Sequence, residues 1–318
     1  MHIVITGADG FIGRHLVKRL LSLAGDTGSP FASANITALD RSFTHLQARD
    51  KLRLVPGSFA DQAILADALQ QPADLVFHLA SVPSGMSEQD PDLGMAVNVH
   101  GTLDLLNALR KQQNCPAVVF ASSIAVYGRP EATLVTDDTL PNPTLSYGAH
   151  KVMGEVLVND YARRGWIKGC ALRLPGIVAR PPEPNGAVSI FISDLIRCMY
   201  TGNSFVCPVS EQAHSWLMSV QCCVDNLLHA ALAEFDARRT WMLPALRVNL
   251  KELARVSARL GGHEESLARL VVWKPDPWVE FNFGSYPPLQ LPQAEAAGFR
   301  ADASVEQLVL GAVSGLDN

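Results

Sequence analysis

Tyr147 and Lys151 are the two residues whose types and spacing first suggest chemistry. They lie four positions apart in the run 146–151, so on a helix both side chains share one face, about 5–6 Å apart at Cβ. An ammonium beside a phenol favours the phenolate, and a phenolate takes up a proton as a general base. A surface helix with a snorkelling lysine gives the same spacing. The pair therefore needs support from other motifs.

A glycine-rich turn near the N-terminus gives that support. Residues 2–6 form a β-branched run that predicts a buried strand, and apolar residues at helical spacing follow the turn. Gly7 permits a tight turn, Gly10 lets the backbone approach a pyrophosphate, and Gly13 lets the helix pack on the sheet. The helix N-terminus then offers free N–H groups to phosphates. A strand–helix turn without any ligand gives the same pattern.

Asp40 ends a second predicted strand, 35–40. A carboxylate at this position accepts hydrogen bonds from both ribose hydroxyls and repels a 2′-phosphate, which favours NAD over NADP. It follows the glycines by about 30 residues instead of the usual ~20, because a Gly/Ser/Pro-rich loop, 25–33, intervenes. The neighbouring Arg41 would favour NADP, but it is Asp40 that occupies the end of the strand, where the ribose would be bound.

The elements that must hold these residues alternate between strand and helix. Further strands are predicted at 52–57, 73–80, 116–123 and 167–178, and helices at 62–70, 93–113 and 146–164, with Asp61 capping the first of these helices. A polar loop, 81–89, lies at the carboxyl end of the fourth strand, where ligands bind in open α/β sheets. The alternation predicts an α/β fold, a Rossmann-type doubly wound parallel sheet.

The C-terminal half has a looser pattern. After a proline-rich loop, 181–186, helices are expected at 190–200, 220–234, 250–260 and 304–313, with strands at 204–209 and 239–246. We therefore expect residues 1–175 to form an NAD-binding core that includes the Tyr–Lys helix. Residues 176–318 should form mainly a smaller, substrate-binding lobe, with some segments returning to the core.

Composition narrows the class of partner. The chain has 318 residues, 48% of them hydrophobic and 18% charged, and a net charge of −5. These values fit a well-cored globular protein and give no reason to expect nucleic acid as a partner. No apolar run approaches the ~20 residues of a membrane span, so no membrane partner is expected.

The cysteines and the N-terminus suggest a reduced compartment. Six cysteines show no CxxC and no paired histidine spacing for zinc, so we expect no metal site. Met1 runs directly into a strand without the features of a signal peptide. A cytoplasmic location is the simplest expectation.

Taken together, the motifs resemble those of a known family. They are TGxxGFIG from residue 6, Asp40, FHLA at 77–80, SSxxVYG at 122–128 and YxxxK at 147–151. This set is similar to that of the extended short-chain dehydrogenase/reductase superfamily, also called the NAD-dependent epimerase/dehydratase family, and the resemblance covers the whole chain. Further stretches, at 120–128, 136–148, 172–185, 214–219 and 298–304, resemble dehydrogenases that oxidise a four-carbon sugar acid at C2.

The resemblance implies a catalytic triad of Ser123, Tyr147 and Lys151. Tyr147 would take the substrate hydroxyl proton, Lys151 would favour its phenolate and bond the nicotinamide ribose, and Ser123 would hold the substrate oxygen. Asn98 would support the lysine through a water. The other residues expected at the cofactor are Gly7, Gly10, Phe11, Ile12, Gly13, Asp40, Ser58, Phe59, Leu79, Ala80, Ser122, Pro175 and Ile177.

Two departures from sugar-nucleotide epimerases point to a small substrate. Epimerases carry an Asn three residues after the Arg of the sixth strand, where this chain has Gly176 after Arg173. They also carry an Arg-Asp before an aromatic residue, where this chain has His214-Ser215-Trp216. A nucleoside diphosphate would therefore lose its usual partners, whereas a small hydroxy acid needs only a donor for its carboxylate.

Candidates for that donor are Ser84, Arg180, Asn185 and His214, which would contact the substrate together with Ser123 and Tyr147. Each has another interpretation: Arg180 could pair with Glu183, Asn185 before Gly186 is a turn signal, and Ser84 and His214 could be ordinary loop residues. Arg173 is expected to be structural, buried with a partner from the sheet.

The hypothesis is an NAD-dependent dehydrogenase of a small sugar acid. A sugar-nucleotide epimerase or reductase of the same superfamily is the first alternative, and a non-enzymatic NAD-sensing regulator is the second. Retention of Ser123, Tyr147 and Lys151 together argues against the regulator. The resemblance also implies a homodimer formed through the helices 93–113 and 146–164.

Overall fold

The computed structural model describes residues 1–129, 133–181, 190–235 and 238–314. The chain forms two compact units and passes between them several times. The first unit comprises Met1–Ser123, Leu145–Arg173 and Leu227–Trp241, and the second Ile124–Thr144, Leu174–Asn226 and Met242–Asn318.

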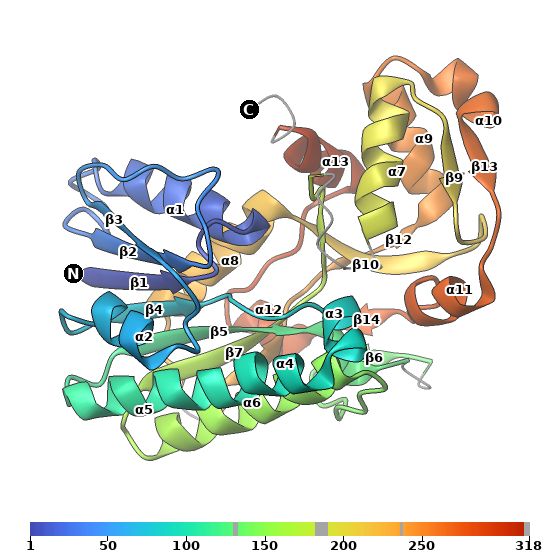
Figure 1. Cartoon of the computed structure of the whole chain (residues 1–318). Helices are drawn as coiled ribbons and strands as arrows, with labels where there is room; N and C mark the ends of the chain where they lie inside the picture. Colours follow the sequence, from blue (N-terminus) through green and yellow to red (C-terminus); the bar gives the residue numbers. More distant parts are fainter. Residues whose placement is uncertain (130–132, 182–189, 236–237, 315–318) are drawn as a thin grey trace. The chain divides into compact units, whose positions relative to one another are not determined.

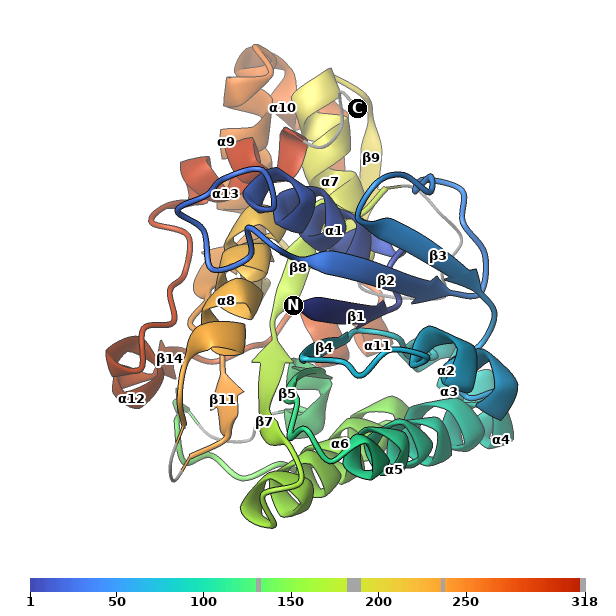
Figure 2. The same ribbon diagram turned by 90° about the vertical axis from the view of Figure 1, so that its left-hand side faces the viewer.

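The first unit is built on a seven-stranded sheet (Figures 1 and 2). The strand order is β11-β7-β5-β4-β1-β2-β3. β1 pairs in parallel with both β2 and β4, β2 pairs in parallel with β3, and β4 with β5. The predicted Rossmann-type parallel sheet is confirmed. Its strands are β1 (His2–Thr6), β2 (Asn35–Asp40), β3 (Leu52–Pro56), β4 (Leu75–His78), β5 (Ala117–Ser123), β7 (Lys168–Leu174) and β11 (Thr240–Met242).

Helices cover both faces of this sheet. α5 (Thr102–Gln112) and α6 (Ser146–Arg163) lie on one face, and α1 (Phe11–Leu23) lies on the other together with the C-terminal half of α8 (Val220–Leu232) (Figures 1 and 2). Apolar residues of α5 and α6 pack against β4 and β5 in one buried cluster, which explains the helical spacing seen in the sequence. The short α2 (Gln62–Ala68) begins at Asp61, whose side chain accepts hydrogen bonds from the amides of Ala63 and Ile64.

The strand order brings the sequence motifs to one edge of the sheet. From β1 the chain proceeds to β2 and β3 on one side and then returns to β4 and β5 on the other. The loops that follow β1 and β4 therefore diverge from a switch point, where open α/β sheets bind ligands. The glycine-rich turn follows β1, Asp40 ends β2 and Ser123 ends β5.

The segment after β4 differs from the prediction. Residues 81–89 were expected to form a polar loop, but Ser84–Gln89 form the helix α3. Pro83 is the N-cap residue, with the extended backbone angles φ −72° and ψ 168° that are usual there, and its carbonyl accepts a hydrogen bond from the Ser87 amide at 2.9 Å, which starts the helix. The next helix begins at Pro91, earlier than predicted, and runs through α4 (Pro91–Met95) and a π-helical segment, Ala96–Gly101, into α5.

Two predicted strands are each divided between two sheets. The run 167–178 forms β7 and, after Pro175, β8 (Gly176–Val178), which belongs to another sheet. The run 239–246 likewise contains β11 and then enters β12 (Leu246–Asn249). Proline has no N–H to donate to a sheet, so Pro175 ends the ladder of β7.

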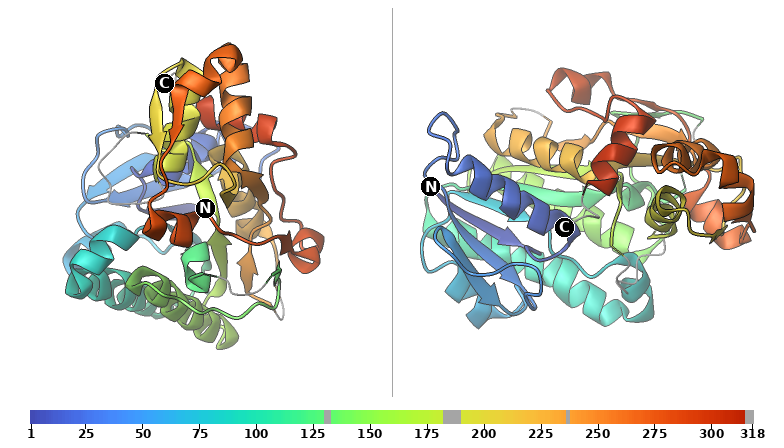
Figure 3. Two further views of the ribbon diagram at one scale, coloured as in Figure 1. Left: turned by 90° about the vertical axis from the view of Figure 1, so that its right-hand side faces the viewer. Right: turned by 90° about the horizontal axis from the view of Figure 1, so that it is seen from above.

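The second unit has a three-stranded sheet in the order β12-β10-β8, with β10 (His214–Ser219) in the centre. Two helices, α7 (Ile190–Thr201) and α9 (Leu250–Leu260), lie side by side (Figures 1 and 3). With α13 (Val305–Val313) they enclose an apolar core that includes Leu217 and Val248. Other elements of this unit are β6 (Val135–Thr136), β9 (Phe205–Cys207), β13 (Val271–Trp273), β14 (Leu289–Gln290), α10 (Leu267–Leu270), α11 (Pro277–Phe283) and α12 (Pro292–Ala296), with 3₁₀ turns at Ile124–Tyr127 and Glu264–Ser266.

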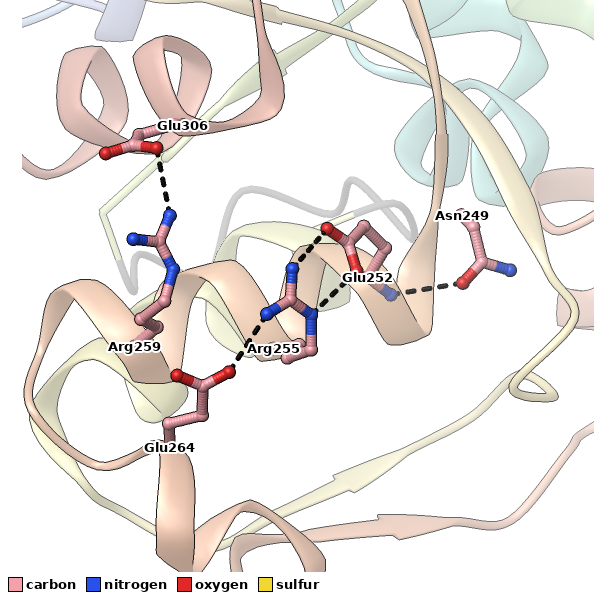
Figure 4. A network of polar contacts seen from close by, with 6 residues as sticks. All are labelled: Asn249, Glu252, Arg255, Arg259, Glu264 and Glu306. Atoms are coloured by element: carbon pink, nitrogen blue, oxygen red, sulfur yellow. Dashed lines mark hydrogen bonds and ion pairs between the residues drawn. The ribbon is translucent and has the colours of Figure 1, made fainter.

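Ion pairs join α9 to its neighbours within the second unit (Figure 4). Arg255 contacts Glu252 at 2.8 Å and Glu264 at 2.9 Å, and Arg259 contacts Glu306 of α13 at 2.9 Å. These side chains are well exposed, so each pair adds little to stability. The helix itself is anchored by the Asn249 side chain, which accepts a hydrogen bond from the Glu252 amide.

Two further findings concern the expectations drawn from composition. All six cysteines are free. Among the described residues, no helix has both the length and the apolar character needed to cross a membrane.

We predict that Gly13→Ala destabilises the first unit. An added Cβ at Gly13 would lie 2.1 Å from the Gly7 carbonyl oxygen, a backbone atom that cannot move aside cheaply. Overpacking of this kind typically costs about 1–3 kcal/mol or more, measurable by urea denaturation. Gly25→Ala is the control, because its Cβ would meet the nearest backbone atom at 3.6 Å. Equal stability of the two variants would contradict this account of the turn.

Candidate active site

Lys151 of α6 is the most deeply buried of the three predicted catalytic residues. Only 3% of the Lys151 surface is exposed to solvent. The ammonium donates a hydrogen bond of 2.7 Å to the Ala121 carbonyl in β5. It also lies 4.9 Å from the ring centroid of Phe120 and 5.4 Å from that of Tyr147. Tyr147 and Lys151 therefore share one face of α6, as their spacing predicts, and that face is turned towards β5.

The surroundings of Lys151 act on its pKa in opposite directions. Burial lowers the pKa of Lys151, whereas negative charge on Tyr147 and Glu155 acts in the opposite direction. Burial lowers the pKa of His78 in β4 and of His150 in α6, and the positive charge of Lys151 acts in the same direction on both. A cation in this position stabilises nearby negative charge, which is what a proton-accepting phenol requires.

Glu155 was missed by the sequence analysis. It lies one turn beyond Lys151 on α6 and is 4% exposed. Arg173 of β7 donates to its two carboxylate oxygens at 2.9 Å from Nε and 2.8 Å from Nη2, and the Ser122 hydroxyl donates at 2.5 Å. Arg173 was expected to pair within the sheet, but this partner is on a helix. The four-residue spacing from Lys151 was the available signal.

Ser123 and Ser122 have different surroundings. Ser123 is the last residue of β5 and is partly exposed, two positions after the carbonyl that binds Lys151. Ser122 is 2% exposed, and its hydroxyl donates to Glu155. The predicted contact of Ser122 with the cofactor would therefore have to involve other atoms of the residue.

The residues predicted to hold a dinucleotide phosphate form a tight turn. Gly7 has a φ of +71°, which favours glycine, and its amide donates to the Leu39 carbonyl at 2.9 Å. α1, a helix of 13 residues, begins after Gly10, and no side chain caps its N-terminus. The first amide N–H groups of the helix can therefore donate hydrogen bonds to a ligand. Phe11 and Ile12, the first residues of that helix, are partly exposed. This turn fits the pyrophosphate of a dinucleotide.

Asp40 is fixed at the tip of β2. Its carboxylate accepts hydrogen bonds from the amides of Asp9, at 2.9 Å, and Arg41, at 2.7 Å. Burial raises the pKa of Asp40, and these two hydrogen bonds partly offset that effect. Four other predicted cofactor residues lie after β3 and β4. Ser58, Leu79 and Ala80 are partly exposed, whereas Phe59 is 3% exposed and packs in an apolar cluster.

Asn98 lies in the π-helical segment and holds the loop that follows β4. Its Oδ1 accepts from the Val82 amide at 2.7 Å, and its Nδ2 donates to the Val82 carbonyl at 3.0 Å. Nδ2 also lies 3.4 Å from Nδ1 of His150, the neighbour of Lys151. The predicted water link to Lys151 stays a prediction. The direct contacts of Asn98 instead order the segment that leads to Ser84.

The predicted substrate residues lie in different parts of the chain. Ser84 is the first residue of α3 in the first unit and is partly exposed. Arg180 belongs to the second unit, where its amide donates to Ser193 Oγ at 2.9 Å. His214 begins β10, with Nδ1 2.7 Å from the Gln212 carbonyl, and burial lowers its pKa. Asn185 lies outside the described residues.

Around β8 and β10 the second unit is well packed. Pro175 precedes β8, and Ile177 within it is 3% exposed and pairs with Met218 of β10. Trp216 is fully buried, and its Nε1 donates to the Pro287 carbonyl at 2.7 Å. In the described ranges, no group of three or more His, Cys, Asp or Glu side chains is arranged to hold a metal ion.

We predict that Glu155→Gln destabilises the protein by about 3–5 kcal/mol, because it leaves the buried Arg173 guanidinium without its charge partner. Chemical denaturation measures the loss. Combining it with Arg173→Met should recover much of the stability, since the buried guanidinium that Glu155 pairs with is then removed as well. Asp160→Asn is the control on the same helix, because Asp160 pairs with Arg163 and Arg164 in solvent. If both substitutions lowered the free energy of unfolding by the same small amount, the buried pair would contribute no more to stability than the exposed one.

The chain is similar in sequence to a known family and to named proteins. Residues 3–232 match the family described as "NAD dependent epimerase/dehydratase family". D-erythronate dehydrogenase of Cupriavidus necator is 37% identical over 315 residues, covering 97% of each chain, and that of Haemophilus influenzae is 31% identical over 322 residues, covering 97% of this chain and 98% of the relative.

A solved structure extends the similarity to three dimensions. The nucleoside-diphosphate-sugar epimerase from Agrobacterium tumefaciens superimposes with a TM-score of 0.89 at 30% identity, over 99% of this chain and 94% of that one. The family match and the two dehydrogenase relatives point to the same conclusion. The chain belongs to the NAD-dependent epimerase/dehydratase family and is an NAD-dependent oxidoreductase.

Proposed function

We propose that the protein oxidises D-erythronate at C2 to the corresponding 2-oxo acid, with Tyr147 as the general base. The observation that carries the chemistry is the buried Lys151 ammonium, 5.4 Å from the Tyr147 ring centroid. The choice of substrate is supported by the full-length similarity to two proteins named D-erythronate dehydrogenase.

In this proposal each residue of the triad has one task. Tyr147 takes the proton of the substrate hydroxyl, and Ser123 donates a hydrogen bond that holds the substrate oxygen. Lys151 favours the phenolate form of Tyr147 and binds the nicotinamide ribose. NAD, when bound, supplies the hydride acceptor. The protein contributes orientation and a fixed positive charge in a dry environment, where electrostatic effects are stronger than in water.

The remaining proposed contacts divide between cofactor and substrate. Asp40 binds the adenosine ribose and the turn Gly7–Gly13 binds the pyrophosphate, with the other cofactor residues named above completing the set. For the substrate carboxylate, Ser84, Arg180, Asn185 and His214 are the candidate donors. Gly176 and His214, at positions where sugar-nucleotide epimerases carry diphosphate-binding residues, favour a substrate without a diphosphate.

A homodimer through the helical stretch 93–113, which includes α5, and the stretch 146–164, which contains α6, is part of the proposal. Met153 and Val156 of α6 support it, because these apolar side chains are 41% and 61% exposed. Both lie on α6 but outside the Tyr147–Lys151–Glu155 series, which is turned towards the sheet. A second chain covering them would leave the catalytic face of the helix unchanged.

The substrate proposal is tested with a panel of C3–C6 sugar acids, each offered with NAD and with NADP. We expect NADH absorbance to rise fastest with D-erythronate. Interconversion of a UDP-sugar without net NADH would instead support the epimerase alternative. Binding of NAD without turnover of any acid or sugar nucleotide would support the regulator.

Tyr147→Phe should lower turnover by about 10²–10⁴-fold, because the ring is kept and the proton acceptor is lost. Affinity for NAD, measured by calorimetry, should stay nearly unchanged. Tyr161→Phe is the matched control on the same helix, since its hydroxyl donates to Asn107 at 2.8 Å and Tyr161 lies more than two helical turns beyond Lys151. A similar loss of turnover in both variants would contradict the role given to Tyr147.

A further inference from the structure

Asp9, the third residue of the glycine-rich turn, joins two parts of the nucleotide-binding region. Its amide donates to the Asp40 carboxylate at 2.9 Å. Its own carboxylate accepts from the amides of Thr44 at 2.7 Å, His45 at 3.1 Å and Leu46 at 2.8 Å. The Thr44 hydroxyl adds a fourth donor at 3.2 Å. With 8% of the residue exposed, this carboxylate is effectively enclosed by the loop.

Three successive amides that converge on one anion form a backbone nest, the kind of concavity that binds phosphate in many proteins. Here the nest lies in the loop that directly follows Asp40, the residue proposed to hold the adenosine ribose. Arg41 begins that loop and is exposed. The loop therefore has the donors that a ribose phosphate would need, but a side chain of the protein already occupies them.

Asp9 also makes the surroundings of Asp40 more negative. Its charge is one of the causes that raise the pKa of Asp40, after burial itself. Two carboxylates joined through one backbone amide would repel an additional phosphate more strongly than Asp40 alone.

We propose that Asp9 is a second determinant of dinucleotide choice: its carboxylate fills the amide nest of residues 44–46 and so excludes the 2′-phosphate of NADP. This inference rests on the proposed position of the adenosine ribose at Asp40. It assigns to Asp9 a role in specificity that its place between two glycines does not suggest.

The experiment compares Asp9→Ala, which empties the nest, with Asp9→Asn, which removes the charge but keeps the volume. Calorimetry gives the dissociation constants of adenosine 2′,5′-bisphosphate, ADP, NADP and NAD. For Asp9→Ala we expect the affinity ratio of the 2′-phosphorylated to the unphosphorylated ligand to rise at least about tenfold, the size of one hydrogen bond to a charged group. Asp9→Asn should show a smaller rise.

Asp26→Ala is the matched control. Asp26 also accepts a backbone hydrogen bond, from Gly28 at 3.0 Å, but it is exposed in the loop that follows α1. The Asp26→Ala substitution removes the same charge as Asp9→Ala, and it should leave the affinity ratio of the 2′-phosphorylated to the unphosphorylated ligand unchanged. A rise of equal size in Asp26→Ala would overturn the proposal, because net charge alone would then explain it.

The proposal also fails if the ratio stays constant in the Asp9 variants, whether or not NAD binding weakens, since Asp9 would then only stabilise the loop. If Asp9→Ala does not fold, as judged by circular dichroism, Asp9→Asn decides the question by the same ratio. Titration of the unchanged protein with NAD is independent of Asp9. If the unchanged protein binds NAD tightly and the ligand affinity ratio stays constant in the Asp9 variants, only the role of Asp9 is rejected. If the unchanged protein does not bind NAD, the proposed cofactor site is rejected as well.

Discussion

A buried ammonium group imposes the strongest constraint on the first unit. Removing a lysine charge from water is costly unless hydrogen bonds and opposite charge replace the lost hydration. The Lys151 ammonium donates a hydrogen bond to a carbonyl of β5 and lies near two aromatic rings. The negative charge of a carboxylate one helical turn away also stabilises it. Two of these partners, the Ala121 carbonyl and the Phe120 ring, need α6 to lie close against β5. Gly154 permits that approach, because an added Cβ there would meet the Phe120 ring at 2.5 Å.

The arginine–glutamate pair continues this arrangement into the sheet. Glu155 opposes the effect of burial on Lys151 and is itself held by Arg173 of β7 and Ser122 of β5. One helix face and two strands therefore share a single buried network. In such a network the position of the proposed catalytic side chains follows from the packing of the sheet, which is the kind of preorganisation that proton transfer requires.

Much of the fold could be predicted from the sequence because its signals are local. Glycines in the turn after β1, an acid at the end of β2 and the four-residue spacing in α6 each report on a few neighbouring residues. What could not be predicted depends on tertiary packing. The strand at 167–178 is continuous in hydrophobicity but changes sheet at Pro175, and Ser84–Gln89 form a helix in a run that is polar. The contacts of Glu155 and Asp9 are likewise made with residues distant in sequence.

The central claim is that hydride leaves C2 of a small sugar acid while Tyr147 accepts the hydroxyl proton. Its most direct test is a single turnover with NAD and D-erythronate deuterated at C2, followed by mass spectrometry of the dinucleotide. The account predicts one deuterium in the NADH, in amounts equal to the 2-oxo acid formed. Unlabelled NADH, or label that stays in the sugar acid, would contradict it.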